Sequence, residues 1–368
     1  MPRWFHSATL LLAFTASACA GDDESGFPFE PKLAELPQGW TSIAPGGDTI
    51  CARGTPYQFF VRPGSVNRVI IDFRGGGACW NQTTCGLGES LFQETADPDE
   101  FIGDESFAGG IYDKNNAENP VKNWHHVYIP YCTGDVHWGN ATRTYGEGDA
   151  AFTIEHKGAV NTRAVLSWVY ANWPAPEKIL VTGCSAGAYG AIMWSAHVRN
   201  HYPNSKVYQL ADSGAGVITQ TFFEESFPQW NAQDSYPMFI PNVDPNAFTR
   251  LPQLYKLVGT TFPDMIVSQY NTKYDDNQTF YFQAMGGGDA YAWSTQMLAN
   301  VAEIEQTTSN FFSYIAPDFK HCIIPYPEFY GVTSGGTRLV DWVSDMVSDR
   351  ELDSVDCEPN CGAPASPP

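Results

Sequence analysis

The stretch Lys178-Ile-Leu-Val-Thr-Gly-Cys-Ser-Ala-Gly-Ala-Tyr-Gly190 determines how the rest of the chain can be interpreted. It begins with an apolar run over 179–182, which predicts a short buried strand. A tight turn follows at Gly183-Cys184-Ser185-Ala186-Gly187, and residues 188–201 have the pattern of a helix. Such a turn lifts the serine hydroxyl clear of a sheet, at a helix N-terminus that favours developing negative charge. Ser185 is therefore a candidate nucleophile, and an ordinary strand-to-helix turn that contains a serine is the simpler alternative.

Length and charge restrict the partners of the chain. With 368 residues it is long enough for one large α/β domain or two ordinary ones. Its formal net charge of −21 disfavours nucleic acid and anionic membrane surfaces, and it would also repel a polyanionic substrate. We therefore expect no nucleic-acid partner, and membrane contact only through a lipid anchor at the N-terminus.

The first residues have the pattern of a secretory signal, with a positive charge at Arg3 and an apolar run too short to span a membrane. Ala16-Ser17-Ala18 suits ordinary signal peptidase, whereas Cys19 after small residues resembles a bacterial lipoprotein box and would be lipidated. Under either interpretation the mature chain is exported, and it is then secreted or lipid-anchored at the cell envelope. We expect residues 1–18 to be the signal peptide and the acidic, proline-bearing residues 19–38 to be a tether.

Strand and helix patterns alternate along the rest of the chain, which predicts an α/β fold with a mostly parallel, doubly wound sheet. The expected strands are 57–62, 68–73, 125–130, 179–182, 207–211, 265–270 and 311–315. The expected helices are 158–172, 188–201 and 337–346. We find no internal repeat and no linker, so residues 39–356 should form one catalytic domain, followed by a Pro-rich tail over 357–368.

Residues 215–262 interrupt this alternation, because they are rich in Phe, Trp and Pro and have little periodicity. In a hydrolase, an insertion at this place forms a cap over the site. A large packed loop region without substrate contact is the equal alternative.

A glycine-rich loop, Gly75-Gly76-Gly77-Ala78-Cys79-Trp80, follows the expected strand at 68–73. It can approach the nucleophile closely and aim backbone N–H groups at an oxyanion, as esterase loops do, although Arg74 stands where their motif has His. An ordinary turn is the alternative, and a phosphate loop would need a Gly-Lys-Ser/Thr sequence that is absent here. The expected oxyanion-hole donors are Gly77, Ala78 and Ala186.

A serine, then an acid after a late strand, then a histidine after the last strand is the chain order of α/β-hydrolases. His321 would take the proton of Ser185, and Asp275 would fix the imidazole tautomer. Most histidines are structural, but His321 is preferred among eight because it follows the last expected strand. Asp276 and Asp212 are rival acids. This chemistry needs neither a metal nor a cofactor.

Residues around the expected site are candidates for substrate contact or for bracing the loops of the site. The loop after the strand at 125–130 carries Asp135, His137 and Trp138, and Trp80 follows the glycine-rich loop. Loops at the carboxyl ends of such strands line the sites of open α/β sheets. For Asp135, a role limited to bracing the loop through backbone N–H groups is the simpler alternative.

Nine cysteines are present, and eight remain when Cys19 is set aside. An even number remaining favours lipidation of Cys19, and eight cysteines in an exported chain predict disulfides. Two pairs are local in sequence, and Cys184 and Cys322 each adjoin a candidate catalytic residue. A free buried thiol at Cys184 is the alternative. The pairs that we expect are Cys79–Cys85, Cys357–Cys361, Cys184–Cys322 and Cys51–Cys132.

Together these residues resemble the pectin acetylesterase/Notum family, from about Cys51 to Cys322. The motifs that carry the resemblance are Gly75-Gly76-Gly77-Ala78-Cys79 with Cys85, Tyr131-Cys132 with Asp135, Gly183-Cys184-Ser185-Ala186-Gly187, Tyr274-Asp275 with Gln278, and His321-Cys322. The resemblance implies an α/β-hydrolase with the triad Ser185, Asp275 and His321. It also implies an oxyanion hole from Gly77, Ala78 and Ala186, and the bridges Cys51–Cys132 and Cys79–Cys85.

The chain departs from the family pattern at two positions. Ala78 stands in place of Trp, which keeps the backbone N–H but changes a wall of the pocket, and Ala188 stands in place of Gly, a mild change inside a helix. The function that we expect is an exported carboxylic-ester hydrolase, monomeric, that deacetylates a polysaccharide or a small acetyl ester. The acidic chain weighs against tight binding of pectin. Alternatives are a lipase-like, polyester- or acyl-protein-cleaving esterase, an amide hydrolase, and a non-catalytic binding protein on a hydrolase scaffold.

Overall fold

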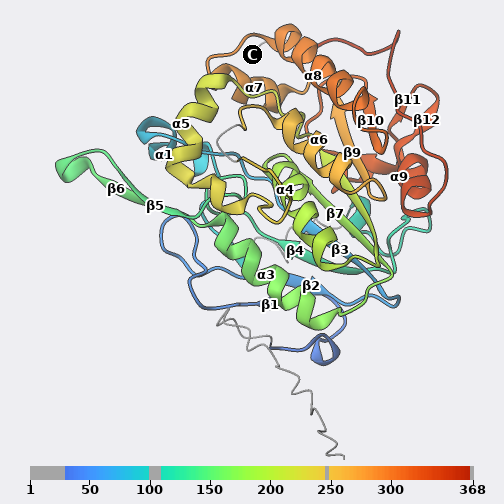
Figure 1. Ribbon diagram of the computed structural model, residues 1–368, viewed down its shortest axis with the longest axis horizontal. Coiled ribbons are helices and arrows are strands. Elements are labelled where there is room, and N and C mark those ends of the chain that lie inside the picture. Colours follow the sequence, from blue (N-terminus) through green and yellow to red (C-terminus); the bar gives the residue numbers. More distant parts are fainter. Residues whose placement is uncertain (1–29, 99–108, 245–247, 365–368) are drawn as a thin grey trace, which may run out of the picture.

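An eight-stranded mixed sheet forms the centre of the computed structural model, in the order β1-β2-β4-β3-β7-β8-β9-β10 (Figure 1). The structure describes residues 30–98, 109–244 and 248–364; the expected signal peptide, Cys19 and the first part of the tether lie outside them. The strands of this sheet are β1 (Thr41–Ile43), β2 (Phe59–Arg62), β3 (Arg68–Phe73), β4 (His125–Ile129), β7 (Lys178–Cys184), β8 (Lys206–Asp212), β9 (Ile266–Thr272) and β10 (Phe311–Ala316).

Six of these strands, from β4 to β10 across the sheet, run parallel, and β1 and β2 form an antiparallel edge. The carboxyl ends of the parallel strands therefore meet at one edge of the sheet. The loops after β3, β7, β9 and β10 leave from that edge, which is where open α/β sheets bind their ligands. This topology confirms the predicted doubly wound sheet.

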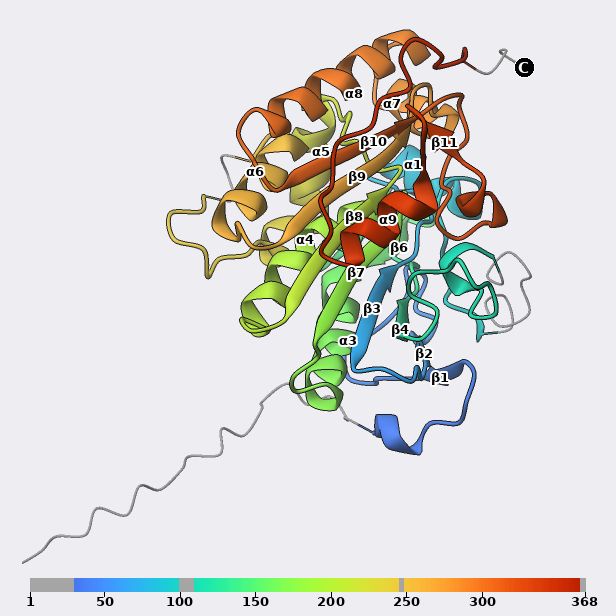
Figure 2. The ribbon, with the colours of Figure 1, turned by 90° about the vertical axis from the view of Figure 1, so that its right-hand side faces the viewer.

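Helices cover both faces of the sheet (Figure 2). Alternate residues along each strand enter two different cores: Val69 and Ile71 of β3 face the core that contains α3 and α4, whereas Ile70 faces the core that contains α9. The helices are α1 (Gln82–Gly86), α3 (Gly158–Asn172), α4 (Ala186–His201), α5 (Gln220–Trp230), α6 (Leu251–Thr261), α7 (Asp276–Ala284), α8 (Ala290–Glu305) and α9 (Leu339–Val347).

Several elements were not predicted from the sequence. A hairpin of β5 (Ala141–Tyr145) and β6 (Phe152–His156) projects from the body of the molecule (Figure 1), and β11 (Thr333–Ser334) pairs with β12 (Thr337–Arg338). Helices α7 and α8 were missed as well. Each begins at an aspartate that caps it: Asp275 accepts from the amide of Gln278 at 2.8 Å, and Asp289 from the amide of Ala292 at 3.0 Å.

The segment with little periodicity, 215–262, contains two helices, α5 and α6. The described part of the expected tether is anchored to α3, because the indole of Trp168 donates to the carbonyl of Pro31 at 3.0 Å and the amide of Leu33 donates to Asn172 at 2.7 Å. Within the described ranges, none of the helices has the length and apolar character needed to cross a membrane.

Candidate active site

Ser185 occupies a sharp turn between β7 and α4. It is the residue before the first residue of α4, and its backbone has φ 57° and ψ −124°, in the region that non-glycine residues avoid. Flanking glycines permit this turn, because a Cβ on Gly187 would lie 1.9 Å from the carbonyl oxygen of Phe73 and a Cβ on Gly183 2.5 Å from that of Gly187. The side chain is thus held at the carboxyl edge of the sheet, beside the N-terminus of α4.

The glycine-rich loop after β3 packs directly on this turn. A Cβ on Gly75 would lie 2.8 Å from the Cβ of Ser185, so only glycine allows the approach. Further along, a Cβ on Gly77 would lie 2.0 Å from the carbonyl oxygen of Leu91 and 2.3 Å from the hydroxyl of Tyr281. Burial raises the pKa of Tyr281 to about 12, opposed by a hydrogen bond from the amide of Ala78.

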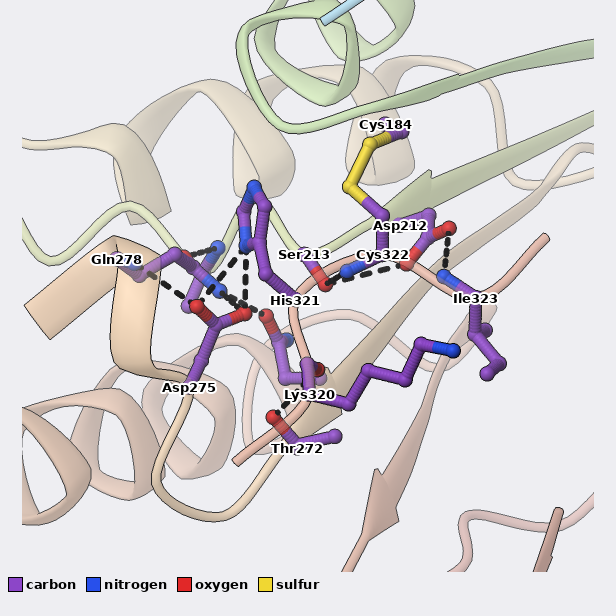
Figure 3. Close-up of polar contacts among 12 residues, drawn as sticks. Cys184, Asp212, Ser213, Thr272, Asp275, Gln278, Lys320, His321, Cys322 and Ile323 are labelled. Carbon is purple, nitrogen blue, oxygen red and sulfur yellow. Dashed lines mark hydrogen bonds and ion pairs between the residues drawn. A yellow bond between two sulfur atoms is a disulfide. The ribbon is translucent and has the colours of Figure 1, made fainter. Parts of the chain in front are cut away.

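His321 follows β10 and is oriented by Asp275 (Figure 3). Its Nδ1 lies 2.9 Å from each carboxylate oxygen of Asp275, which is fully buried. Gln278 holds the same carboxylate through its backbone amide at 2.8 Å and its side-chain amide at 2.9 Å. The opposite ring nitrogen, Nε2, is buried and has no hydrogen-bond partner among the described residues.

The electrostatic environment favours a charged imidazole. Burial alone would lower the pKa of His321, but the charge and hydrogen bond of Asp275, with smaller contributions from Asp212 and Asp276, raise it above its ordinary value. The structure separates these three acids. Asp275 contacts the ring, Asp276 is an exposed residue of α7, and the carboxylate of Asp212 binds backbone amides instead. Asp275 thus has the position that a triad acid needs.

Two cavities meet at Ser185 and His321. The first, of about 70 Å³, has mostly apolar walls that include aromatic rings from α5 and from the loops after β3 and β4. The second, of about 330 Å³, has walls that are about equally polar and apolar and extends along the segment that follows His321. The residues shared by both cavities are Gly77, Ser185, Asn277, Tyr281 and His321.

Comparison with known proteins identifies the family. A family model described as Pectinacetylesterase matches residues 42–247. The chain belongs to the pectinacetylesterase family. Pectin acetylesterase 11 of Arabidopsis thaliana is 22% identical over 370 residues, which cover 88% of this chain and 91% of that protein. Palmitoleoyl-protein carboxylesterase NOTUM of Mus musculus is 27% identical over 172 residues, which cover 45% of this chain but 33% of the mouse protein.

A solved structure shows the same fold. The Wnt deacylase Notum from Drosophila has a TM-score of 0.62 and 17% identity, over 85% of this chain and 94% of that one. The predicted α/β-hydrolase fold and family resemblance are thus confirmed. As a member of the pectinacetylesterase family, the chain is a carboxylic-ester hydrolase.

The four predicted pocket residues of this pectinacetylesterase-family chain divide into two groups. Trp80 and Trp138 line the apolar cavity. Asp135 and His137 are buried and are not among the residues that line the two cavities. Their contacts favour the loop-bracing alternative, and substrate contact stays a prediction for both. Asp135 accepts from the hydroxyl of Thr133 and the amides of His137 and Gly158. The ring of His137 lies 2.9 Å from the carbonyl oxygen of Arg74, and burial lowers its pKa to about 4.

Four disulfides join the pairs expected from the sequence: Cys51–Cys132, Cys79–Cys85, Cys184–Cys322 and Cys357–Cys361. Cys184 is therefore not a free thiol. Each group of His, Cys and carboxylate side chains found close enough to share a metal ion in the described residues includes one of these disulfides. Their sulfur atoms are therefore unavailable as thiolate ligands.

Sequence reasoning missed the cavity residues contributed by α5 and α7. Phe222, Phe227 and Trp230 of α5 line the apolar cavity, and so do Asn277 and Tyr281 of α7. One signal was present for α7, because an aspartate three residues before Gln278 is a helix N-cap pattern. A helix placed there would have directed Gln278 and Tyr281 to neighbouring positions on one face.

Proposed function

We propose that the chain is an exported serine esterase that removes short acyl groups, acetyl above all, from a carbohydrate-like alcohol. The observation that carries this proposal is the arrangement of His321. One ring nitrogen is held by the buried Asp275, and the other is unpaired in a cavity that Ser185 also lines. This is the arrangement needed for a base that serves a serine nucleophile.

In the proposed reaction, the Oγ of Ser185 attacks the ester carbonyl carbon while Nε2 of His321 takes the hydroxyl proton. The carbonyl oxygen becomes an oxyanion beside the amides of Gly77 and Ala186, at the N-terminus of α4. When the tetrahedral intermediate collapses, the alcohol leaves with the proton from His321. Water then repeats the sequence on the acyl-enzyme and releases the acid. Asp275 keeps the proton of the neutral ring on Nδ1 and stabilises the imidazolium.

The resting structure requires small movements for this chemistry. Nε2 of His321 makes no hydrogen bond to Ser185. Catalytic hydrogen bonds are often long or unformed without substrate and tighten in the complex. We propose the amides of Gly77, Ala78 and Ala186 as the oxyanion donors.

The size of the apolar cavity supports a short acyl group. At about 70 Å³ it is small, and two of the rings that line it, Trp80 and Phe222, make an edge-to-face contact at 4.9 Å between centroids. We assign the acyl group to this cavity. The alcohol then lies in the larger cavity of about 330 Å³, whose walls are more polar than those of the first and which His321 also lines.

Names of the relatives include both a pectin acetylesterase and a palmitoleoyl-protein carboxylesterase. The small cavity favours acetyl over a long acyl chain for this protein. The net charge of −21 favours a neutral acetylated polysaccharide or a small acetyl ester over a polyanion. Four disulfides support an oxidising compartment, in agreement with the expected export.

The test is hydrolysis of p-nitrophenyl esters from acetate to palmitate, followed by acetate release from acetylated xylan and acetylated pectin. We expect a preference for acetate that Ser185→Ala abolishes without loss of the cooperative thermal unfolding transition. A preference for long chains would move the proposal to a lipid or acyl-protein substrate. Full activity in Ser185→Ala would overturn the assignment of the nucleophile.

A further inference from the structure

Asp212, a rival for the triad acid in the sequence, contacts two loops of the site at once. It is the last residue of β8 and is fully buried. Its backbone carbonyl accepts a hydrogen bond from the amide of Ser185 at 2.8 Å. Its carboxylate oxygen Oδ2 accepts from the amides of Ile323 and Ile324, each at 2.8 Å (Figure 3). One residue therefore connects two backbone segments: the turn at 183–187, here called the nucleophile turn, and the segment 321–324, here called the histidine loop.

Ser213 extends this connection by one amide. Its hydroxyl donates to Oδ1 of Asp212 at 3.2 Å and accepts from the amide of Cys322 at 2.9 Å. The backbone of Ser213 is itself held, because its amide donates to the carbonyl of Tyr270 at 2.8 Å. Three consecutive amides after His321, those of residues 322–324, are thus bound by two consecutive residues of one strand end.

The histidine loop needs such support. Cys322 has φ 58°, in the left-handed region that a non-glycine residue keeps only when its surroundings impose it. The disulfide Cys184–Cys322 also joins the residue before Ser185 to the residue after His321. The hydrogen bonds of Asp212 and this disulfide are two independent links between the same two loops.

We propose that Asp212 is a positioning residue that sets the imidazole of His321 relative to Ser185 through the backbone of both loops. This inference rests on the proposed function, because it assumes that these two side chains react together. Asp212 touches neither side chain, so its effect is on geometry. A displacement of about 1 Å at a reacting pair can reduce the rate by about 10²-fold.

A purely electrostatic role is the competing explanation. Asp212 is one of the negative charges that raise the pKa of His321, and Asp276 is another. The two differ in their contacts, because Asp212 is buried and bonded to the loop whereas the Asp276 side chain is exposed. Asp276→Asn is therefore a matched control that removes a nearby charge and leaves the bonds to the histidine loop in place.

The test compares Asp212→Ala, Asp212→Asn and Asp276→Asn by kcat, KM and the pH profile on p-nitrophenyl acetate. Asparagine keeps an oxygen that can accept from both amides, and alanine does not. We expect Asp212→Ala to lower kcat about 100-fold with KM nearly unchanged, as for a displaced base. Asp212→Asn should recover most of that kcat, and Asp276→Asn should keep it.

Equal losses of kcat in Asp212→Ala and Asp212→Asn would overturn the proposal in favour of a charge effect. An unchanged kcat in Asp212→Ala would show that Asp212 has no role in the reaction. If Asp212→Ala has no cooperative unfolding transition, Ser213→Ala replaces it, since it deletes the acceptor of one loop amide. We then expect a loss of about 10-fold in kcat, and an unchanged kcat would refute the inference. An inactive wild-type enzyme would instead contradict the proposed function.

Discussion

Cys184 and Cys322 are 138 residues apart in the sequence and form a disulfide between the residue that precedes Ser185 and the residue that follows His321. Its two ends lie on the nucleophile turn and on the histidine loop. The disulfide therefore fixes the distance between the two side chains proposed to react. Few positions in the chain could link stability and catalysis so directly.

Removing this disulfide should reduce both properties. We predict that Cys184→Ala with Cys322→Ala lowers the free energy of unfolding by about 2–5 kcal/mol, as for a native disulfide that closes a long loop, and lowers kcat. The matched control is removal of Cys357–Cys361, which closes a loop of sequence separation 4. Urea unfolding and esterase kinetics on both double variants test the prediction, and an equal effect of the two would contradict it.

The activity should depend on the protonation of His321. Because the negative charges around it raise its pKa above the ordinary 6.5, the ring is charged and inactive as a base at low pH, and kcat/KM should rise through a pKa above 6.5. Asp275→Asn removes the strongest of these charges, so the acid limb should move to lower pH. The rate should also fall, by about 10⁴-fold if the tautomer is lost as in other serine hydrolases. A profile that keeps its pKa in this variant would argue against Asp275 as the partner.

Asp135 should matter for stability and little for substrate. It is buried outside both cavities, and its Oδ2 accepts from the amide of Gly158 at 2.8 Å. In Asp135→Asn an NH₂ group replaces one of the carboxylate oxygens that accept these hydrogen bonds. At least one buried donor then has no acceptor, which should lower the free energy of unfolding by about 1–3 kcal/mol. KM for p-nitrophenyl acetate should stay near the wild-type value, since Asp135 is not among the residues that line the two cavities. A large rise in KM with normal stability would restore the substrate-contact hypothesis.

Phe222 should limit the acyl chain. It lines the apolar cavity, whereas its neighbour Phe223 on α5 is equally buried but does not. We predict that Phe222→Ala raises the ratio of butyrate to acetate hydrolysis about 10-fold or more, given that each methylene in an apolar pocket changes discrimination by about 10–200-fold. Phe223→Ala should keep the wild-type ratio. The same rise in the butyrate-to-acetate ratio in both variants would indicate a general loosening of α5, and Phe222 would then not be the residue that limits the acyl chain.

The sequence predicted the parts of this molecule that depend on local patterns. The turn at Ser185 lies between an apolar strand and a helix, and close backbone contacts at Gly75, Gly183 and Gly187 explain why glycine is needed there. The order of strands then placed the loops after β3, β7, β9 and β10 at one edge. The fold class followed from the same alternation of strands and helices. The pair Cys184–Cys322 was expected from the candidate catalytic residues beside it, and the family resemblance implied Cys51–Cys132.

Other features depend on contacts between distant segments. Helix α7 buries few residues, among them Gln278 and Thr279, so its apolar periodicity is weak although Asp275 caps it. Asp135 and His137 follow a strand of the sheet, yet burial against the neighbouring backbone turns them away from the site. The link from Asp212 to the loop at 322–324 spans more than a hundred residues and has no local signal. Its discovery required the folded chain.

We propose above all that Ser185 is the nucleophile and that His321 activates it. The most direct measurement is reaction with a fluorophosphonate, followed by intact-protein mass and peptide mapping. We predict one adduct per chain, located on Ser185, absent in Ser185→Ala and formed much more slowly in His321→Ala. An adduct on another residue, or none in a wild-type protein that still hydrolyses p-nitrophenyl acetate, would contradict it.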